Sequence, residues 1–175
     1  GSIRLGKLGG NTTAETQSGS IEVDHAKGTL RLKTGGGTLS LGELNGETVA
    51  ETSSGSIQVK KAAAALNVRT SGGSVKIDDA SHSIQAHTSS GSIIVRLSGP
   101  LQSDSRVNSG GGTVQVSLPA DIPLSIDAQT GGGSATTNLP LPISKDRRKI
   151  QGDLNGGGKT LSIRTSSGSL SLNKL

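Results

Sequence analysis

The sequence has 175 residues, which suits one domain or one elongated repeat array, and only 30% of them are hydrophobic. Phe, Tyr, Trp, Met and Cys are all absent. This composition excludes a disulfide framework and a thiolate metal site, and it predicts a thin core of Ile, Leu, Val, Ala and Thr. The formal charge of +5 indicates a mild attraction to anionic surfaces and does not by itself indicate nucleic acid.

A segment of eight residues recurs along the chain at steps of 18 residues. Its copies read TQSGSIEV, TGGGTLSL, TSSGSIQV, TSGGSVKI and TSSGSIIV, and they start at Thr16, Thr34, Thr52, Thr70 and Thr88. Later copies start at Ser109, Thr130 and Thr165, after steps of 21, 21 and 35 residues. Three-residue insertions account for the first two of these steps, and the last step is about two coils long. A fixed period of this kind is typical of a solenoid.

Each coil has a regular pattern of apolar residues after its glycine. In one coil the set is Ile21, Val23, Ala26, Leu30, Leu32 and Thr34. The alternation predicts two short strands per coil with these side chains inside, and stacking pairs each strand with its counterpart one coil away, about 4.8 Å distant. The coil after Gly112 keeps the pattern if its insertion precedes Ile122, which puts Ile126, Ala128 and Thr130 inside.

These features predict an all-β fold, a single-stranded right-handed parallel β-helix (β-solenoid) with mainly 18-residue coils and about nine coils. The right hand is the usual hand of parallel crossovers. We expect a single domain over residues 1–175 with an irregular insertion at about 138–151, where LPLPISKDRRKI breaks the pattern, and we expect coiling to resume at Gly152. No apolar run reaches the length of a membrane span, and no signal-peptide pattern opens the sequence.

The repeat also predicts how corners and surfaces are built. The repeated glycines are expected to adopt positive φ at the corners, and the threonine column is expected to face inward rather than to form an exposed array that orders water or ice. Residues 18 apart become neighbours, which predicts one alternating-charge ladder and two charge pairs. The members are Glu15, Lys33, Glu51 and Arg69 in the ladder, Lys60 with Asp78, and Lys61 with Asp79.

We find no recognisable catalytic, metal or cofactor site in the sequence. A polysaccharide hydrolase or lyase needs clustered carboxylates or a base beside a cation, whereas Glu15 and Glu51 are predicted to lie two coils apart with Lys33 between them. The histidines, His25, His82 and His87, have no convergent partners of the kind a metal site requires. The glycine stretches neither precede a helix nor carry a phosphate-loop ending. We therefore predict no enzyme, no metal and no cofactor.

The sharpest basic cluster consists of Lys145, Arg147, Arg148 and Lys149, on the least regular segment. Two interpretations stay open, a solvated loop and a contact with an anionic polymer such as teichoic acid, lipopolysaccharide or nucleic acid. Without aromatic residues, stacking on single-stranded nucleic acid is disfavoured, and no nucleic-acid partner is expected. We name these four residues as the candidate anionic-polymer contact.

The TSSGSI and TGGG elements, the GDLNGGG segment near the end and the two-strand coil resemble the bacterial putative-adhesin β-strand repeat family. The resemblance covers essentially the whole chain. It implies a parallel β-helix in a cell-envelope protein, located in the envelope or outside the cell, and it supplies no defined ligand site.

The expected function is therefore a non-catalytic bacterial cell-envelope or surface module, an adhesin-like scaffold or binding domain. Its expected partner is envelope polysaccharide or another envelope protein. One alternative is a self-assembling structural solenoid, because uncapped strand edges can associate end to end. Another is a polysaccharide-active β-helix enzyme.

Overall fold

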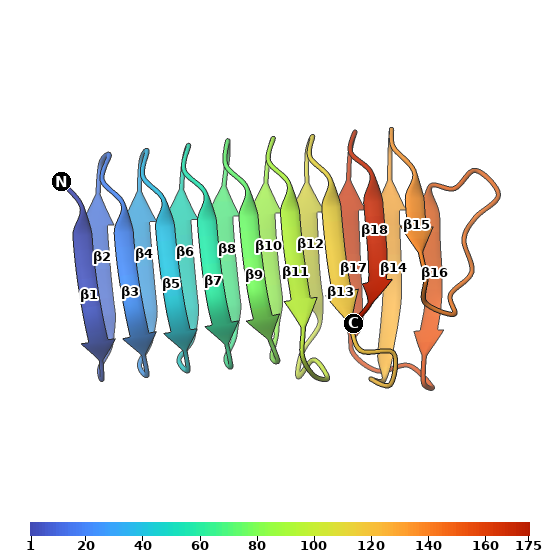
Figure 1. Ribbon diagram of the computed structural model, residues 1–175, viewed down its shortest axis with the longest axis horizontal. Helices are drawn as coiled ribbons and strands as arrows, with labels where there is room; N and C mark the ends of the chain where they lie inside the picture. Colours follow the sequence, from blue (N-terminus) through green and yellow to red (C-terminus); the bar gives the residue numbers. More distant parts are fainter.

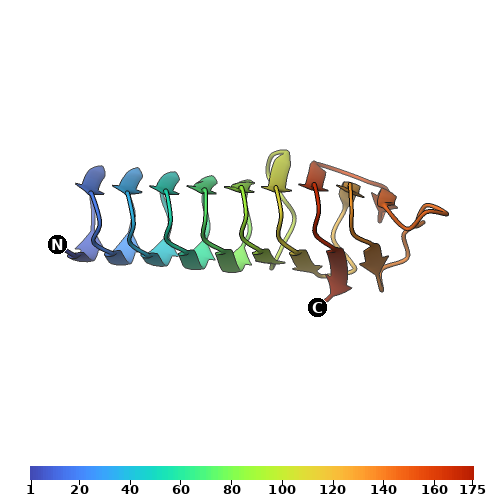
Figure 2. The ribbon, with the colours of Figure 1, turned by 90° about the horizontal axis from the view of Figure 1, so that it is seen from above.

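The computed structural model describes every residue from Gly1 to Leu175 as strand, turn or loop. The strands form two facing sheets of nine strands each, joined by short turns along both edges (Figures 1 and 2). No element has the length and apolarity of a membrane-spanning helix. The flat, two-layered coil explains how a chain with so few apolar residues buries them.

The front layer in Figure 1 is sheet A, and the back layer is sheet B. In spatial order, sheet A contains β1 (Ile3–Leu8), β3 (Ile21–Ala26), β5 (Leu39–Leu44), β7 (Ile57–Ala62), β9 (Val75–Ala80), β11 (Ile93–Leu97), β13 (Val114–Leu118), β18 (Leu170–Lys174) and β15 (Ala135–Thr137). From the same end, sheet B contains β2 (Thr12–Thr16), β4 (Leu30–Thr34), β6 (Thr48–Thr52), β8 (Leu66–Thr70), β10 (Ile84–Thr88), β12 (Ser105–Ser109), β17 (Thr160–Thr165), β14 (Leu124–Thr130) and β16 (Lys149–Leu154).

The strands from β1 to β12 stack in chain order and confirm the predicted register. Ile21 lies opposite Ile3 on one side and Leu39 on the other, each 18 residues away. Figure 1 shows the front strands running downward and the back strands upward as the chain advances from the N terminus, which is a right-handed coil. About six turns are of this regular kind rather than the nine expected, because the later strands stack in a different order.

The core is a thin layer between the two sheets. Its 40 buried hydrophobic residues form one continuous cluster. Burial alternates along the strands, so that Leu30 and Leu32 on β4 are buried while Arg31 and Lys33 are exposed. The residues expected inside after the Gly112 insertion are buried as predicted, namely Ile122, Ile126, Ala128 and Thr130.

The threonine column faces inward, as its position in the alternation predicts. Thr70 is 3% exposed, and its hydroxyl donates to the carbonyl oxygen of Gly55, the glycine that opens its coil (2.9 Å). The same hydroxyl accepts a hydrogen bond from the N–H of Gly73, the glycine that opens the next coil (3.1 Å). Neighbouring coils repeat both bonds, at Thr52 and Thr88 among others. The column therefore satisfies buried backbone groups at one corner, and its hydroxyls do not form an exposed array.

The repeated corner glycines do not have positive φ, so that expectation was wrong. Among the glycines only Gly156 and Gly157 have positive φ. Close stacking is what requires glycine at the corners, because a Cβ added to Gly55 would lie 1.8 Å from the Gly37 carbonyl oxygen. On Gly73 it would lie 2.0 Å from the Gly55 carbonyl oxygen. A side chain at these corners would push neighbouring coils apart.

The last coil does not lie at the end of the solenoid. β17 is inserted between β12 and β14, and β18 is inserted between β13 and β15. Coiling does not resume at Gly152 as predicted, because that residue lies in β16, which pairs antiparallel with β14. The connection from β16 back to β17 passes over β14 (Figure 2). The 138–148 loop forms the far tip, and the C terminus lies within the row of coils.

Two charge pairs expected on sheet A are not formed. Asp78 pairs with Lys76 of its own strand, at 3.2 Å between Oδ1 and Nζ, rather than with Lys60 on the neighbouring strand. No ion pair joins Lys61 to Asp79. Residues two apart on a strand share a face, so Lys76 reaches Asp78 without crossing to β7.

Candidate functional site

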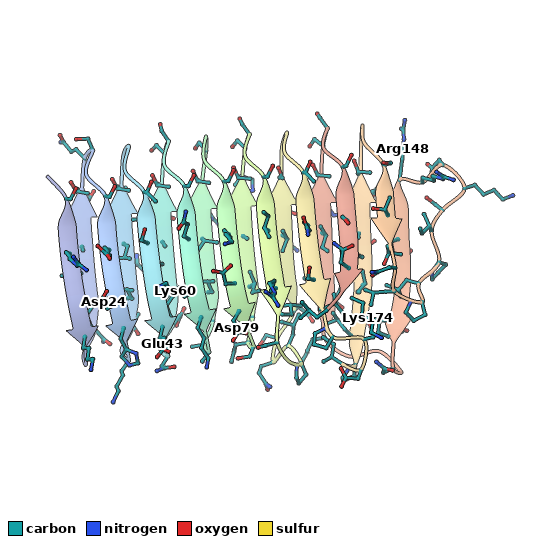
Figure 3. The ribbon with its side chains drawn as sticks, in the orientation of Figure 1. Asp24, Glu43, Lys60, Asp79, Arg148 and Lys174 are labelled. Carbon is teal, nitrogen blue, oxygen red and sulfur yellow. The ribbon has the colours of Figure 1, made fainter.

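The four basic residues predicted as a polymer contact lie at the far tip of the solenoid. Lys145, Arg147 and Arg148 are exposed on the 138–148 loop, and Lys149 is the first residue of β16. Figure 3 shows the labelled Arg148 at this tip, beside the last strands. The loop thus presents three cationic side chains to solvent.

Ser144 organises this loop and brings a negative charge into it. The Ser144 hydroxyl accepts hydrogen bonds from the N–H groups of Arg148 (3.2 Å) and Lys149 (2.9 Å) and donates one to Asp146. This hydroxyl and the Arg148 N–H hold the pKa of the Asp146 carboxyl below its usual range. Lys149 Nζ also lies 3.9 Å from an Asp127 carboxylate oxygen. Two carboxylates therefore weaken the basic cluster.

A second polar surface lies on the outer face of sheet B, over β8, β10, β12 and β17. Two shallow hollows of about 240 and 330 Å³ adjoin there and share the side chains of Gln85 and Arg106. None of the four strands contains Asp or Glu. We call this surface the arginine–amide groove, and its principal lining residues are Asn67, Arg69, Gln85, His87, Arg106 and Asn108.

The polar side chains of the arginine–amide groove lack partners within the protein. Arg69 and Arg106 are exposed and take part in none of the ion pairs or side-chain hydrogen bonds of the chain. The Oδ1 atom of Asn108 is buried and accepts no hydrogen bond. An unmet buried acceptor costs about 1–3 kcal/mol. The hydrogen-bonding capacity that the groove offers to an external group lies in its exposed side chains, those of Arg69, Gln85, His87 and Arg106.

One side of the groove continues the charge ladder predicted from the sequence. Glu15, Lys33, Glu51 and Arg69 are successive register neighbours on β2, β4, β6 and β8, which confirms the ladder. Glu15 and Lys33 form an ion pair of 3.7 Å. Arg69 is beside Glu51 but forms no ion pair with it, so the ladder ends in a free guanidinium at the edge of the groove.

Charges on the other side of the groove are paired. Arg164 on β17 donates hydrogen bonds to the Asp127 carboxylate (3.2 Å) and the Gln129 side-chain oxygen (3.1 Å), both on β14. Asp104 lines the second hollow and accepts a hydrogen bond from the Thr160 N–H (2.9 Å). The one carboxylate of the arginine–amide groove is therefore already hydrogen-bonded, and the groups beyond β17 are paired.

Three of the four strands of this groove could have been found by extending the predicted ladder along the sequence. Extending the ladder column past Arg69 leads to His87 and Asn108, and the three strands concerned contain no acidic residue. The fourth strand, β17, could not be found by extending the ladder, because it lies next to β12 only as part of the inserted last coil.

The outer face of sheet A differs because it mixes both signs of charge. Asp24, Glu43, Lys60 and Asp79 follow one another across it (Figure 3). Several of its charges are paired locally, and His25 Nδ1 lies 3.3 Å from a Glu43 carboxylate oxygen. The mixture of signs makes this face less suited than the arginine–amide groove to a polymer of one charge.

The geometry supplies hydrogen-bonding and cationic groups rather than metal ligands. No three His, Asp or Glu side chains lie close enough together to hold a metal ion. His25 lies on sheet A, His82 lies in the turn before β10 with its Nδ1 3.3 Å from the Ser83 hydroxyl, and His87 lines the arginine–amide groove. The three imidazoles are therefore dispersed over different parts of the solenoid.

No curated protein matches this sequence. A solved structure described as a putative cell adhesion protein from Clostridium sporogenes covers 99% of this chain and 91% of its own, at 11% sequence identity and a TM-score of 0.38. A family model described as Toastrack DUF4097, a domain of unknown function, matches residues 6–173. This match spans nearly the whole chain and agrees with the resemblance to a β-strand repeat family of unknown function. The chain therefore belongs to the Toastrack DUF4097 family.

Proposed function

We propose that this chain is a non-catalytic module of the bacterial cell envelope or surface that binds an anionic polymer. The observation that carries the proposal is the arginine–amide groove, where Arg69 and Arg106 form no ion pair and Asp104 is the one acidic lining residue. Unpaired guanidinium groups at a surface are suited to bidentate binding of carboxylate or phosphate. The basic loop residues Lys145, Arg147 and Arg148 are a further contact in the same proposal.

The rigid stack of coils suits a binding scaffold. Each sheet places outward side chains about 4.8 Å apart along the solenoid axis, so a long ligand meets groups at fixed intervals. The acidic and basic side chains that contact one another do so in surface ion pairs, and no group of three acidic or histidine side chains converges. This supports the non-catalytic part of the proposal. The envelope location is supported by the resemblance to repeats of cell-envelope proteins.

Self-assembly is the second candidate, and the shape of the far tip argues against it. End-to-end continuation of the solenoid would pair parallel edge strands, but sheet B ends there in the antiparallel strand β16. The proline-containing loop before β16 lies at the same end. A particle size that stays constant in light scattering as concentration rises would remove this candidate, whereas growth would revive it.

The proposal is tested by co-sedimentation with purified anionic envelope polymers, teichoic acid and lipopolysaccharide, with neutral dextran as the control. We expect binding to the anionic polymers that weakens as salt is raised from 50 mM to 500 mM, because exposed charges are screened. Binding to none of the anionic polymers at low salt would overturn the proposal. Release of soluble products from any polymer would instead favour the enzyme alternative.

A variant of the tip separates the two cationic surfaces. Replacing Lys145, Arg147, Arg148 and Lys149 together by glutamine is expected to weaken binding by only about threefold, because Asp146 and Asp127 already oppose these charges. Complete loss of binding in this variant would show that the binding site is the loop and not the groove.

A further inference from the structure

We infer that the arginine–amide groove binds a linear acidic glycan, which lies across β8, β10, β12 and β17. This inference rests on the proposed function and names its site and its ligand class. The ligand carries carboxylate groups that the arginines bind and free hydroxyls that the amides bind. Three features of the groove lead to this chemistry: the spacing of its arginines, the amides beside them, and the order of its strands.

The two free arginines stand on a diagonal of the outer face, with amides beside them. Arg69 on β8 and Arg106 on β12 are separated by β10 and offset by two residues along the strands, which places them roughly 12 Å apart. Gln85 of β10 lies in register with Arg106, and Asn67 of β8 lies in register with Gln85. A guanidinium binds a carboxylate with two parallel hydrogen bonds, and an amide both donates to and accepts from hydroxyls. The groove therefore places acid-binding guanidinium groups beside hydroxyl-binding amides.

A polynucleotide fits this arrangement poorly. Each strand of a nucleic-acid duplex carries one phosphate about every 3.4 Å along the axis, so it favours dense cations, whereas Arg69 and Arg106 stand well apart with neutral amides beside them. The chain also contains no aromatic residue on which a base could stack. The hydroxyl-binding amides, in contrast, match the most abundant groups of a glycan.

The inserted last coil is what keeps Arg106 free. Ser162 on β17 lies in register with Arg106 on one side and with Asp127 on the other. If β14 followed β12 in chain order, Asp127 would occupy the register position beside Arg106 and bring a second carboxylate to this end of the groove. The strand order therefore separates an acid from the groove, and Asp127 pairs with Arg164 and Lys149 instead.

The test measures binding of polygalacturonate, a linear glycan of carboxylated sugars, by affinity electrophoresis and titration calorimetry. The groove variant combines Arg69→Gln and Arg106→Gln. The matched control combines Arg31→Gln and Arg96→Gln, which removes the same charge from two exposed arginines outside the groove that have no ion-pair partner. We expect the groove variant to bind at least tenfold more weakly and the control to stay within about twofold of the parent.

A second variant blocks the groove without removing an arginine. Ser162→Asp places a carboxylate beside Arg106, and we expect a loss of affinity similar to that of the groove variant. Unfolding midpoints of all variants are measured in parallel, because only a binding loss without a large shift in midpoint reports on the groove. Ser117→Asp, on the outer face of sheet A, is the control for the added charge.

The outcomes separate this inference from the proposed function. If the groove variant and its control bind polygalacturonate equally well, the groove is not the site, although anionic-polymer binding itself still stands. If the parent binds no anionic polymer, the proposed function fails first. If fully methyl-esterified polygalacturonate binds as tightly as the acid, or if polyphosphate or single-stranded DNA competes more strongly through the same two arginines, an acidic glycan is the wrong ligand class.

Discussion

The six regular coils from β1 to β12 and the strands after them share one corner motif but differ in the order in which they stack. In the regular part, Thr70 bonds to Gly55, 15 residues earlier in the chain. In the later part, Thr165 makes the same bond to Gly112 over 53 residues, and Thr130 makes it to Gly168 over 38 residues. The bonding is equivalent although the chain connectivity is not. The corner motif therefore decides how coils pack and does not decide which coil is the neighbour.

Specific polar contacts favour the inserted position of the last coil. Asn155, at the start of the connection from β16, donates from its side-chain amide to the carbonyl oxygens of Ala120 (2.6 Å) and Ile122 (3.1 Å). At the end of the coil, the Lys174 N–H donates to the Asn138 side-chain oxygen (2.6 Å). The Asn155 bonds join two connections, and the Lys174 bond joins β18 to the loop after β15, whereas the corners of the coils are interchangeable. Chain order in this region is thus set by the loops.

The strand order is testable by cysteine cross-linking, and the expected effect is nearly all or none. The natural chain has no cysteine. Gln115→Cys with Ser171→Cys joins register neighbours on β13 and β18, whereas Gln115→Cys with Thr136→Cys joins strands that have β18 between them, roughly 10 Å apart. We expect mild oxidation to cross-link the first pair almost completely and the second hardly at all, measured by non-reducing electrophoresis. The opposite result would mean that the coils follow chain order.

Corner glycines should give the largest loss of stability from one substitution in the regular coils. Gly55→Ala puts a methyl group 1.8 Å from a backbone oxygen of the neighbouring coil, so we expect unfolding to become easier by about 3 kcal/mol. Gly72→Ala is the matched control, because its nearest neighbouring atom lies 3.7 Å from the added Cβ. Urea unfolding followed by circular dichroism measures both. Equal effects would show that close stacking is not what requires glycine at the corner.

Removing a corner hydroxyl should cost less, and by the same amount in both regions. Thr70→Val and Thr165→Val each leave a buried glycine carbonyl and a glycine N–H without their hydrogen bond, with an expected cost of about 2 kcal/mol. Thr13→Val, at an exposed position of β2, should change stability little. A cost at Thr70 without one at Thr165 would contradict the view that the corner motif acts alike in consecutive and inserted coils.

Much of the fold could be predicted because it is encoded locally and repeatedly. The 18-residue period with two apolar alternations per coil is enough to fix the strands, their inward residues and the register, including Ile122 and Ile126 beyond an insertion. The inward threonine column follows from the same parity. The reason for the corner glycines could not be inferred, because it depends on the distance between coils rather than on the conformation of one residue.

The order of the last coils could not be predicted because every coil has the same threonine and glycine corner and can stack on any other coil. Steps of 21 and 35 residues to Thr130 and Thr165 fit either order, since both residues end strands that present the same inward pattern. The arginine–amide groove depends on that order, as Ser162 rather than Asp127 lies beside Arg106. The basic loop, in contrast, was visible in the sequence because its four cations are nearly contiguous.

The smallest predicted effect concerns the boundary between the two regions. Asp127→Asn removes the carboxylate that pairs with Arg164 (3.2 Å) and lies 3.9 Å from Lys149, so two cations become free at the end of the groove. Surface pairs contribute at most about 1 kcal/mol, so the unfolding midpoint should hardly move, while polygalacturonate should bind about two- to threefold more tightly at low salt.

The matched control for this substitution is Asp121→Asn, which makes the same change of net charge in the exposed connection between β13 and β14. We expect it to leave affinity unchanged, and we expect the gain at Asp127 to disappear in 1 M salt, where charges interact over only about 3 Å. An equal gain in both variants would show that the ligand senses the overall charge of the protein. A gain confined to Asp127→Asn would show that the inserted coil and the acid beside it set the limit of the binding surface.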